Sequence, residues 1–418
     1  MLKKVSIERN RGIFQNISYI TVLQVFNVIA PLITYPYLVD VLGRDLYGVF
    51  ITAQALVYYF SLFIGWGSDN VCAKYVSIYR SDKRKLSEIF SSVLSVRAVV
   101  WIVGLGVYIL FVLLMPTYRQ YYLLFLLTYG MTLYDVLFPQ YLFQGLEKMK
   151  YATFVVIGVK LFFIILIFGV VRERTDVYMV PLLYSIGYLL GGIASLYIVF
   201  SLIGLKLMNT GRKISGFLVK ESFPIFASDL ITTIKDRFNI LLMGSCIGMG
   251  NVVIYDLAMK INLLIAKPTE ILRIALFPRA AKDRDLSMIR KTILVSFVTA
   301  TLLVTVVNIF LPYIVRFFLN EDIDLLPIRL FTLAPILLSI SVLIAFNVFV
   351  AFGYNRYVLN SIIITTSCYV FLLVSCAFTH HLNTLLTFVM ISVISYFVEF
   401  VYRLVKYKKI VCELAPQG

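Results

Sequence analysis

Charged side chains occur inside two otherwise apolar stretches in the second half of the sequence, residues 221–246 and 252–276. They are Asp229, Lys235, Asp236 and Arg237 in the first stretch, and Asp256, Lys260, Lys267 and Glu270 in the second. On a helix, Asp229 and Asp236 share a face, and the four charges of the second stretch share one stripe. A charge at bilayer depth costs about 2.5–3.5 kcal/mol and usually faces a water-filled substrate path. We therefore expect these charges to line a cavity, with structural ion pairs between helices as the alternative.

Lys235 and Arg237 lie near the middle of their stretch, where neither side chain needs to reach an interface, so they are the foremost candidates for gripping an anionic head group. Lys267 lies nearer the cytoplasmic end, from which it could instead extend into the interface. In the first half, Asp135 and Lys160 are single charges of opposite sign inside apolar stretches. We expect both to face the same cavity.

The first apolar stretch carries polar residues at helical spacing. Gln24 and Asn27 lie on one face with Pro31, and a second proline, Pro36, follows. Each proline removes a helical hydrogen bond and favours a bend. This pattern predicts a gate helix whose polar face, with Gln24 and Asn27, lines the cavity, although a simple packing kink has the same signature.

The composition of the 418 residues requires a membrane. Hydrophobic side chains make up 61% and charged ones 14%, against about 45–50% and about 25% in soluble domains. The excess of apolar surface must face lipid, which excludes a soluble enzyme, a secreted disulfide scaffold and a disordered chain. The net charge of +16 is then assigned to loops that set topology, and no nucleic-acid partner is expected.

Twelve apolar runs have the roughly 20 residues that a spanning helix needs. They lie near 15–38, 46–66, 89–114, 121–142, 151–171, 177–203, 221–246, 252–276, 292–313, 327–351, 357–379 and 384–405. The sequence therefore predicts an all-α integral membrane protein of about twelve transmembrane helices.

The loop charges predict the orientation. With the N-terminus in the cytoplasm, the cytoplasmic segments hold 25 Lys and Arg and the opposite loops hold 5. Cytoplasmic loops are enriched in these residues, so both termini are expected in the cytoplasm.

Weak internal similarity suggests a six-plus-six duplication. Leu42-Gly43 before the second run resembles Ile247-Gly248 before the eighth, and Lys85-Leu86-Ser87 resembles Asp285-Leu286-Ser287. We predict an N-terminal six-helix bundle over 1–205, a cytoplasmic linker over 206–220 and a C-terminal six-helix bundle with a short cytoplasmic tail over 221–418.

Sequence motifs of enzymes and cofactor sites are missing. The chain has no G-x-x-x-x-G-K-[ST], G-x-S-x-G or H-E-x-x-H pattern, and its five cysteines are scattered. The adjacent His380 and His381 would point apart on a helix. We therefore predict a protein that is not an enzyme and holds no cofactor or metal.

Several segments resemble the Wzx-type O-antigen and polysaccharide flippases. They are Asn16-Ile17-Ser18-Tyr19, the run from Gln24 to Leu38, Val41 to Gly48, Phe143-Gln144-Gly145-Leu146-Glu147-Lys148-Met149-Lys150, and Ala275-Leu276-Phe277-Pro278. The resemblance implies the fold of the multidrug/oligosaccharidyl-lipid/polysaccharide exporters, in which two six-helix bundles form a V around a central cavity.

The resemblance also implies a substrate and a location. The substrate would be an undecaprenyl-pyrophosphate-linked oligosaccharide repeat unit of O-antigen or capsule type, moved from the cytoplasmic to the periplasmic leaflet of the bacterial inner membrane. Membrane lipids, an O-antigen polymerase and a chain-length regulator are the implied partners. The family's cavity is usually cationic, whereas acids and bases balance in residues 221–276 of this sequence. Which base meets the pyrophosphate is therefore open.

Other functions fit parts of the pattern. A multidrug or metabolite antiporter of the related exporter branch would share the fold and the charged stripes, but the 143–150 segment favours the flippase. A membrane enzyme such as an O-antigen polymerase would need a large external loop, and the longest predicted one has about a dozen residues. A pore is disfavoured because strong opposed charges occur on only two runs.

Overall fold

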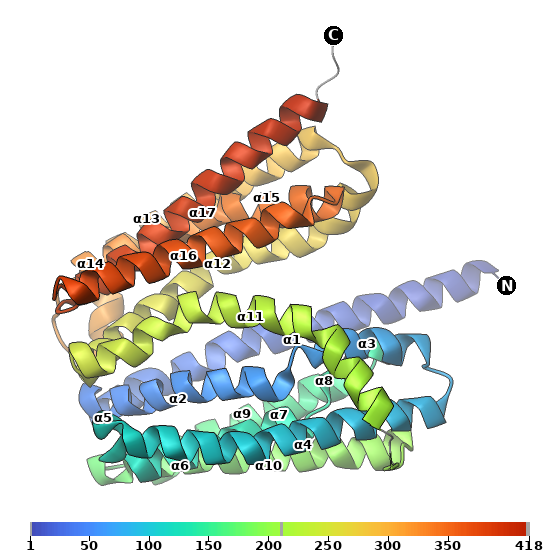
Figure 1. Ribbon diagram of the computed structural model, residues 1–418, viewed down its shortest axis with the longest axis horizontal. Coiled ribbons are helices and arrows are strands. Elements are labelled where there is room, and N and C mark those ends of the chain that lie inside the picture. Colours follow the sequence, from blue (N-terminus) through green and yellow to red (C-terminus); the bar gives the residue numbers. More distant parts are fainter. Residues whose placement is uncertain (1, 210–211, 415–418) are drawn as a thin grey trace. The chain divides into compact units, whose positions relative to one another are not determined.

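The computed structural model describes the backbone of residues 2–209 and 212–414, and every regular element within these ranges is helical (Figure 1). Within them, the side chains of residues 2–18, 20, 212–213, 235–236, 278 and 414 are not described. The predicted all-α fold class is therefore confirmed. The helices pack into two units, residues 1–230 and 231–418.

Unit 1 contains the elements up to residue 203 and the first half of α11. These elements are α1 (Leu2–Leu42), α2 (Arg44–Gly65), α3 (Ser68–Ile78), α4 (Lys83–Leu114), α5 (Pro116–Arg119), α6 (Tyr122–Tyr129), η1 (Gly130–Thr132), α7 (Leu133–Leu137), α8 (Gln140–Gly145), α9 (Met149–Val170), η2 (Arg174–Tyr178), α10 (Met179–Tyr197), η3 (Ile198–Ile203) and α11 (Arg212–Cys246). α9 packs against both α1 and α10, and α2 packs against α4 and α6. Each of the predicted spans one to six is thus represented by a helix or a run of short helices.

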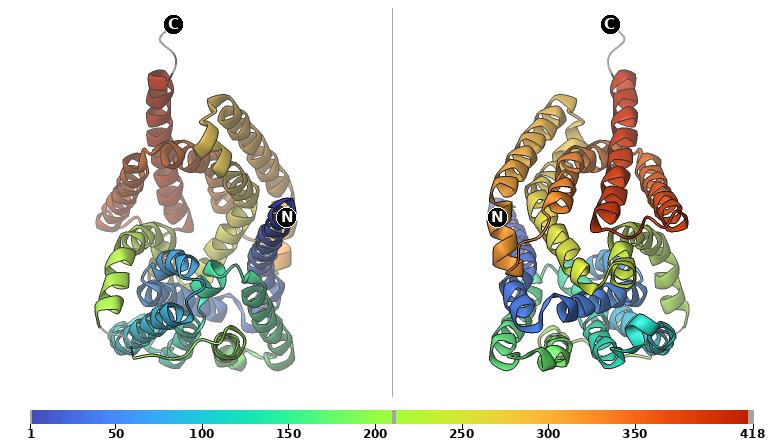
Figure 2. Two further views of the ribbon diagram at one scale, coloured as in Figure 1. Left: turned by 90° about the vertical axis from the view of Figure 1, so that its right-hand side faces the viewer. Right: turned by 90° about the vertical axis from the view of Figure 1, so that its left-hand side faces the viewer.

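Unit 2 begins within α11, which continues from unit 1 without a break in the helix. Its further elements are α12 (Met249–Asp283), α13 (Leu286–Leu319), α14 (Leu326–Phe331), α15 (Ala334–Ile344), η4 (Ala345–Val350), α16 (Asn355–Phe378) and α17 (Leu385–Leu414). α17 packs against α14, α15 and α16 (Figure 2). The unit boundary lies at 230/231, inside the predicted span seven. The bundles at 1–205 and 221–418 with a linker at 206–220 stay a prediction.

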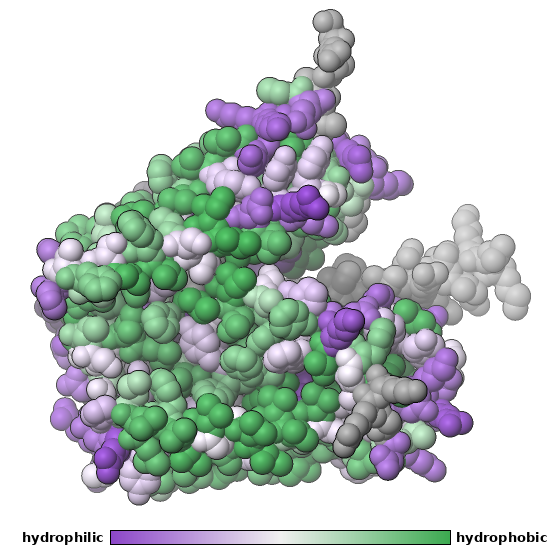
Figure 3. All heavy atoms as spheres, viewed as in Figure 1, coloured by the Kyte–Doolittle hydropathy of each residue, from purple (hydrophilic) through white to green (hydrophobic). Residues whose placement is uncertain are grey.

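Eleven helical segments of the described chain are long and apolar enough to cross a membrane. α11, the predicted seventh span, is helical but does not qualify, because its charged residues lower its hydropathy. Exposed apolar side chains cover the middle of the helices, and hydrophilic ones gather toward helix ends (Figure 3). This distribution is the one that lipid around the middle of each helix requires.

The local structure supports the duplication signals and corrects one register. Gly43 and Gly248 precede α2 and α12 with nearly the same backbone angles, φ 77 and ψ 159 against φ 91 and ψ 154. Asp82 and Asp285 each cap a helix by accepting hydrogen bonds from the backbone two and three residues on. Asp285 therefore matches Asp82, and the expected match with Lys85 was wrong by three residues, because a lysine side chain has no acceptor oxygen with which to make this cap.

A second shared feature is that spans four and ten are both broken. Span four is divided into α6, η1, α7 and α8, and span ten into α14, α15 and η4. Pro139 stands at one break, and Pro335 is the second residue of the helix after the other. Spans four and ten are six apart, as a six-plus-six duplication predicts.

The glycine at the start of α12 offers a stability test. At φ 91 and ψ 154 the backbone of Gly248 is in a region that a Cβ strains, although no neighbouring atom lies within 4 Å of the Cβ position. We expect Gly248→Ala to destabilise the protein by about 1–3 kcal/mol, measured by thermal unfolding in detergent. Gly106→Ala is the matched control, because this glycine lies within α4 with equally free space. It should be neutral or slightly stabilising. Equal behaviour of the two variants would contradict the backbone argument.

Candidate functional site

The helices α1 and α9 run in the same direction and are joined by three hydrogen bonds among the described residues. Thr153 Oγ1 donates to the Tyr19 carbonyl at 3.1 Å, Lys160 Nζ to the Asn27 carbonyl at 3.5 Å, and Tyr37 Oη to the Val171 carbonyl at 2.6 Å. The two residues of each pair are 133 or 134 positions apart in the sequence, which shows that the two helices stay in register. Two of the predicted cavity residues, Lys160 and Asn27, therefore meet in unit 1.

The Asn27 carbonyl is available to Lys160 because of Pro31. In an α-helix this carbonyl would accept the backbone N–H of residue 31, and proline has none. α1 nevertheless stays helical through both Pro31 and Pro36. The predicted gate prolines thus lie within a continuous helix that lacks two of its own hydrogen bonds, and their gating role stays a prediction.

Lys160 is a buried cation with little compensation. It is 8% exposed, and no carboxylate forms a salt bridge with it within the described residues. The backbone oxygen of Asn27 lies at the outer limit of hydrogen bonding from it. The Asn27 side chain is exposed and that of Gln24 is half-buried, so the polar face of α1 reaches the surface of the unit beside Lys160.

A second polar group in unit 1 is centred on Arg97 of α4, which is 3% exposed. Its guanidinium donates to Ser68 Oγ at 2.7 Å, to Asp69 Oδ1 at 2.8 Å and to the Asp135 carbonyl at 2.9 Å. The Tyr141 ring lies 5.5 Å away from it. Asp135, predicted to line the cavity, thus takes part through its backbone in a network that joins α3, α4 and α7.

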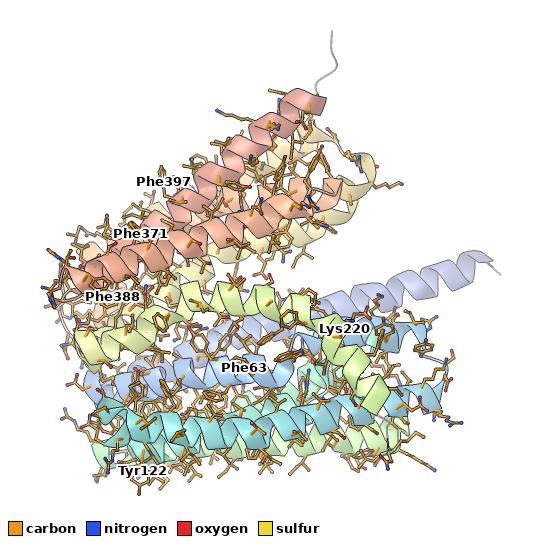
Figure 4. The ribbon with its side chains drawn as sticks, in the orientation of Figure 1. Phe63, Tyr122, Lys220, Phe371, Phe388 and Phe397 are labelled. Carbon is orange, nitrogen blue, oxygen red and sulfur yellow. The ribbon has the colours of Figure 1, made fainter. Side chains whose placement is uncertain are left out.

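The residues at the break between α2 and α3 contact the first half of α11. Trp66 and Gly67 both have left-handed backbones, with φ 47 and φ 63. The Trp66 ring stacks on Phe226 at 4.1 Å, and its Nε1 donates to the Val219 carbonyl at 3.1 Å. A Cβ on Gly67 would lie 2.8 Å from the Phe226 nitrogen. Figure 4 labels Phe63 on α2, whose ring also packs on Phe226, and Lys220 on α11.

In unit 2, the predicted charged stripe of α12 is largely neutralised within the helix. Lys260 forms an ion pair with Asp256 one turn away, and Lys267 forms one with Glu270 at 2.8 Å. Spacings of four and three residues place such side chains side by side. These two lysines therefore already have anionic partners, but within one helix and not between helices as the structural alternative expected. Whether they contact a substrate stays a prediction.

The structure describes the side chains of only two of the four charged residues predicted on α11, Asp229 and Arg237, and these two lie in different units. The side chain of Asp229 is exposed and lies in unit 1, and that of Arg237 is half-buried and lies in unit 2. The side chains of Lys235 and Asp236 lie outside the described residues. The expectation that these residues contact a substrate stays a prediction.

Two buried polar networks in unit 2 were not expected. Asn239 donates to Tyr255 Oη and Ser392 Oγ, both at 2.9 Å, and accepts from Tyr369 Oη at 2.6 Å. This network joins α11, α12, α16 and α17. In the other, Arg403 pairs with Glu399 at 2.7 Å, and both side chains are about 6% exposed.

Comparison with known protein families identifies the chain. The sequence pattern of the family described as "Polysaccharide biosynthesis protein" matches residues 13–282, well over half of the chain. The chain belongs to this family. The matched range includes α1, α9, the Arg97 network and the charged part of α12, so these features are carried by the segment that defines membership.

Curated relatives and solved structures agree with the family. The chain is 26% identical over 286 residues to the "Putative O-antigen transporter" of Escherichia coli (strain K12), covering 67% of this chain and 68% of the relative. It is also 26% identical to the protein of the same description from Shigella dysenteriae over 64% of this chain and 67% of the relative. The relatives named by activity are transporters, as the sequence analysis predicted for this chain.

Solved structures show the fold. The chain is similar to "Lipid II flippase MurJ, inward closed conformation", with a TM-score of 0.73, 14% identity and coverage of 94% of this chain and 87% of that one. It is also similar to a multidrug resistance MATE family transporter of the MOP superfamily, with a TM-score of 0.62, 13% identity and coverage of 93% and 100%. This member of the polysaccharide biosynthesis family is thus a multi-pass integral membrane protein of the predicted exporter fold.

The sequence did not predict a role for Asp69, the aromatic contact of Trp66 or the partners of Arg97. The predicted second span ended near residue 66, so Asp69 lay outside it. The signal that could have located them was Trp66-Gly67, an aromatic–glycine step between two helical stretches. Arg97 inside the third span should then have required a nearby acid.

The Arg97 network predicts a stability effect. We expect Arg97→Met to lower the free energy of unfolding by about 2–4 kcal/mol, because three hydrogen bonds to buried or half-buried groups are lost. Thermal unfolding in detergent measures this. Arg84→Met, which removes an 80% exposed cation paired with Glu88, is the control and should change little. Normal stability of Arg97→Met combined with lost transport would instead assign Arg97 to the substrate.

Proposed function

We propose that this protein is a flippase for lipid-linked oligosaccharides. It moves undecaprenyl-pyrophosphate-linked repeat units, of O-antigen or capsule type, from the cytoplasmic to the periplasmic leaflet of a bacterial inner membrane. The observation that carries the proposal is the family match over residues 13–282 together with O-antigen transporters that align with two thirds of the chain. The fold similarity to a lipid II flippase is consistent with it.

The chemistry of such a substrate fits the distribution of polar groups. A charged diphosphate cannot cross a hydrocarbon layer about 30 Å thick without polar partners, whereas the lipid tail can stay in the bilayer. The membrane-spanning helices carry charged and polar side chains in their interior and exposed apolar side chains on their outer surfaces. In this proposal the head group contacts the predicted cavity set. Its members are Lys160, Asp135, Gln24, Asn27, Asp229, Lys235, Asp236, Arg237, Asp256, Lys260 and Lys267, with Pro31 and Pro36 at the gate.

Both chain ends lie in the cytoplasm in this proposal. The excess of loop Lys and Arg on one side is five to one. The parallel direction of α1 and α9 fits this, since both are odd-numbered spans. An O-antigen polymerase and a chain-length regulator, which would use the flipped product, are the partners that we propose.

The function is tested by deleting the gene from its host. We expect surface polysaccharide to be lost and lipid-linked oligosaccharide to accumulate on the cytoplasmic side, with both restored by the plasmid-borne gene. Lipid extraction and polysaccharide electrophoresis measure this. Unchanged surface polysaccharide and no accumulated intermediate would refute the proposal.

A multidrug or metabolite antiporter is the second candidate, favoured by the fold similarity to the MATE transporter. It predicts a different outcome of the same deletion. The deletion strain would become sensitive to cationic drugs or accumulate a soluble metabolite, while its surface polysaccharide stayed normal.

The proposed orientation predicts the behaviour of fusions. Alkaline phosphatase, active only in the periplasm, should be inactive when fused after residue 418 and active when fused after Arg119 in the loop between α4 and α6. Green fluorescent protein fused after residue 418 should fluoresce. An active phosphatase at the C-terminus would overturn the twelve-span topology.

A further inference from the structure

Among the predicted cavity lysines whose side chains the structure describes, Lys160 differs from Lys260 and Lys267 in its partner. Lys260 and Lys267 each face a carboxylate on their own helix. Lys160 faces only a carbonyl dipole, at 3.5 Å. An ammonium group bound to a carbonyl is much less neutralised than one bound to a carboxylate, so a mobile anion gains more by binding at Lys160 than at Lys260 or Lys267.

The position of Lys160 along its helix also fits an anion that must be carried across the bilayer. It stands eleven residues after Met149 and ten before Val170, the ends of α9. At about 1.5 Å per residue this is about 15 Å from either end. Lys160 thus lies near the middle of α9, at the depth of the bilayer where an unpaired charge is most costly. The Asn27 side chain beside it is exposed.

The acceptor of Lys160 lacks the donor that an α-helix would give it. Because Pro31 has no N–H, the Asn27 carbonyl cannot accept the usual hydrogen bond from residue 31. Loss of the Lys160 contact therefore leaves a carbonyl that must turn toward water or another polar group. A bend of α1 at Pro31 is the movement that allows this.

We propose that Lys160 is a substrate-operated latch: it holds α1 straight through the Asn27 carbonyl and releases it when the diphosphate of the lipid-linked substrate takes the ammonium instead. The proposal rests on the flippase function given above. It assigns the diphosphate to one particular base and couples its arrival to the movement of the predicted gate helix.

The coupling has a defined direction. The substrate binds more tightly to the bent form, in which Lys160 is free, than to the straight form, in which Lys160 is engaged. A ligand shifts a conformational equilibrium by the difference of its affinities for the two forms. Diphosphate binding therefore bends α1, and release of the substrate lets the Lys160–Asn27 bond form again.

Binding is measured with purified full-length protein in nanodiscs. The probes are undecaprenyl diphosphate and, in a separate arm, inorganic diphosphate, so that a lipid-bound head group and a free anion are distinguished. Movement of α1 is measured by the electron paramagnetic resonance distance between spin labels at Val22 of α1, which precedes the bend at Pro31, and at Tyr122 of α6, which is labelled in Figure 4. Both side chains are exposed and belong to unit 1.

The first variant tests the anion contact. Lys160→Met should weaken binding of undecaprenyl diphosphate at least tenfold and abolish the distance change, whereas Lys160→Arg, which keeps the charge, should retain binding within about threefold. Binding of the lipid by Lys160→Met with wild-type affinity would overturn the proposal.

The second variant separates binding from movement. Pro31→Ala supplies the missing N–H to the Asn27 carbonyl, so α1 no longer needs the latch to stay straight. We expect this variant to bind undecaprenyl diphosphate at least as tightly as the wild type but to lose the distance change and polysaccharide export. A wild-type distance change in Pro31→Ala would contradict the latch.

Tyr37→Phe is the matched control. It removes another hydrogen bond between α1 and α9, to the Val171 carbonyl, but leaves Lys160 and Pro31 in place. Its affinity and distance change should equal those of the wild type. If Tyr37→Phe behaved like Lys160→Met, any loosening of α1 would suffice and the latch would be wrong.

The outcomes distinguish this proposal from the flippase function itself. Export that depends on the gene, together with wild-type affinity of Lys160→Met, would refute the latch and leave the flippase intact. A wild-type protein that neither binds undecaprenyl diphosphate nor supports export would refute both. Tight binding of inorganic diphosphate but not of the lipid would show that a free anion is the ligand and would overturn the coupling to lipid transport.

Discussion

The structure depends on one constraint: inside a hydrocarbon layer, every charge and every backbone polar group must find its partner within the protein. Arg97 satisfies the constraint with three acceptors and Arg403 satisfies it with Glu399. Asn239 does so through three side chains on three other helices. Each of these groups contacts several partners or an opposite charge, which makes them parts of the scaffold. They fix which helices pack together within each unit.

The same constraint identifies a place in unit 1 where the scaffold is incomplete. Pro31 leaves one carbonyl of α1 without its helical donor, and Lys160 brings a cation to it without a carboxylate. The lysine lacks an ion pair and the carbonyl lacks its helical hydrogen bond. One long hydrogen bond between them compensates poorly for both. An arrangement of this kind is stable enough to fold and weak enough to exchange its partner, which a carrier of a charged head group requires.

Much of the fold follows from the sequence because hydropathy acts locally. Eleven of the twelve predicted spans are helices long and apolar enough to cross a membrane. The remaining one is α11, whose charged residues lower its hydropathy. Gly43 and Gly248 were correctly matched, since the turn before a helix needs a glycine in both halves. The pairing of Lys260 with Asp256 was also accessible, because a spacing of four residues decides it.

The candidate site was less predictable, because the role of each charged residue depends on which groups from other helices contact it. The sequence placed Lys160 and Asn27 in one cavity set, but only packing of α9 on α1 shows that they touch. Asp69 was missed because its helix follows a left-handed break at Trp66 and Gly67, and hydropathy alone ends the span there. The broken spans four and ten needed the three-dimensional structure as well, since hydropathy over a whole span does not show where its helix is interrupted.

The central claim is that the diphosphate of the substrate is held by Lys160. The most direct measurement is an experimental structure of the full-length protein in nanodiscs with bound undecaprenyl diphosphate. The account predicts phosphate oxygens within hydrogen-bonding distance of Lys160 Nζ, the Asn27 carbonyl without the lysine, and α1 bent at Pro31. A diphosphate bound at Lys260 or Lys267, with Lys160 still on the Asn27 carbonyl and α1 straight, would contradict it.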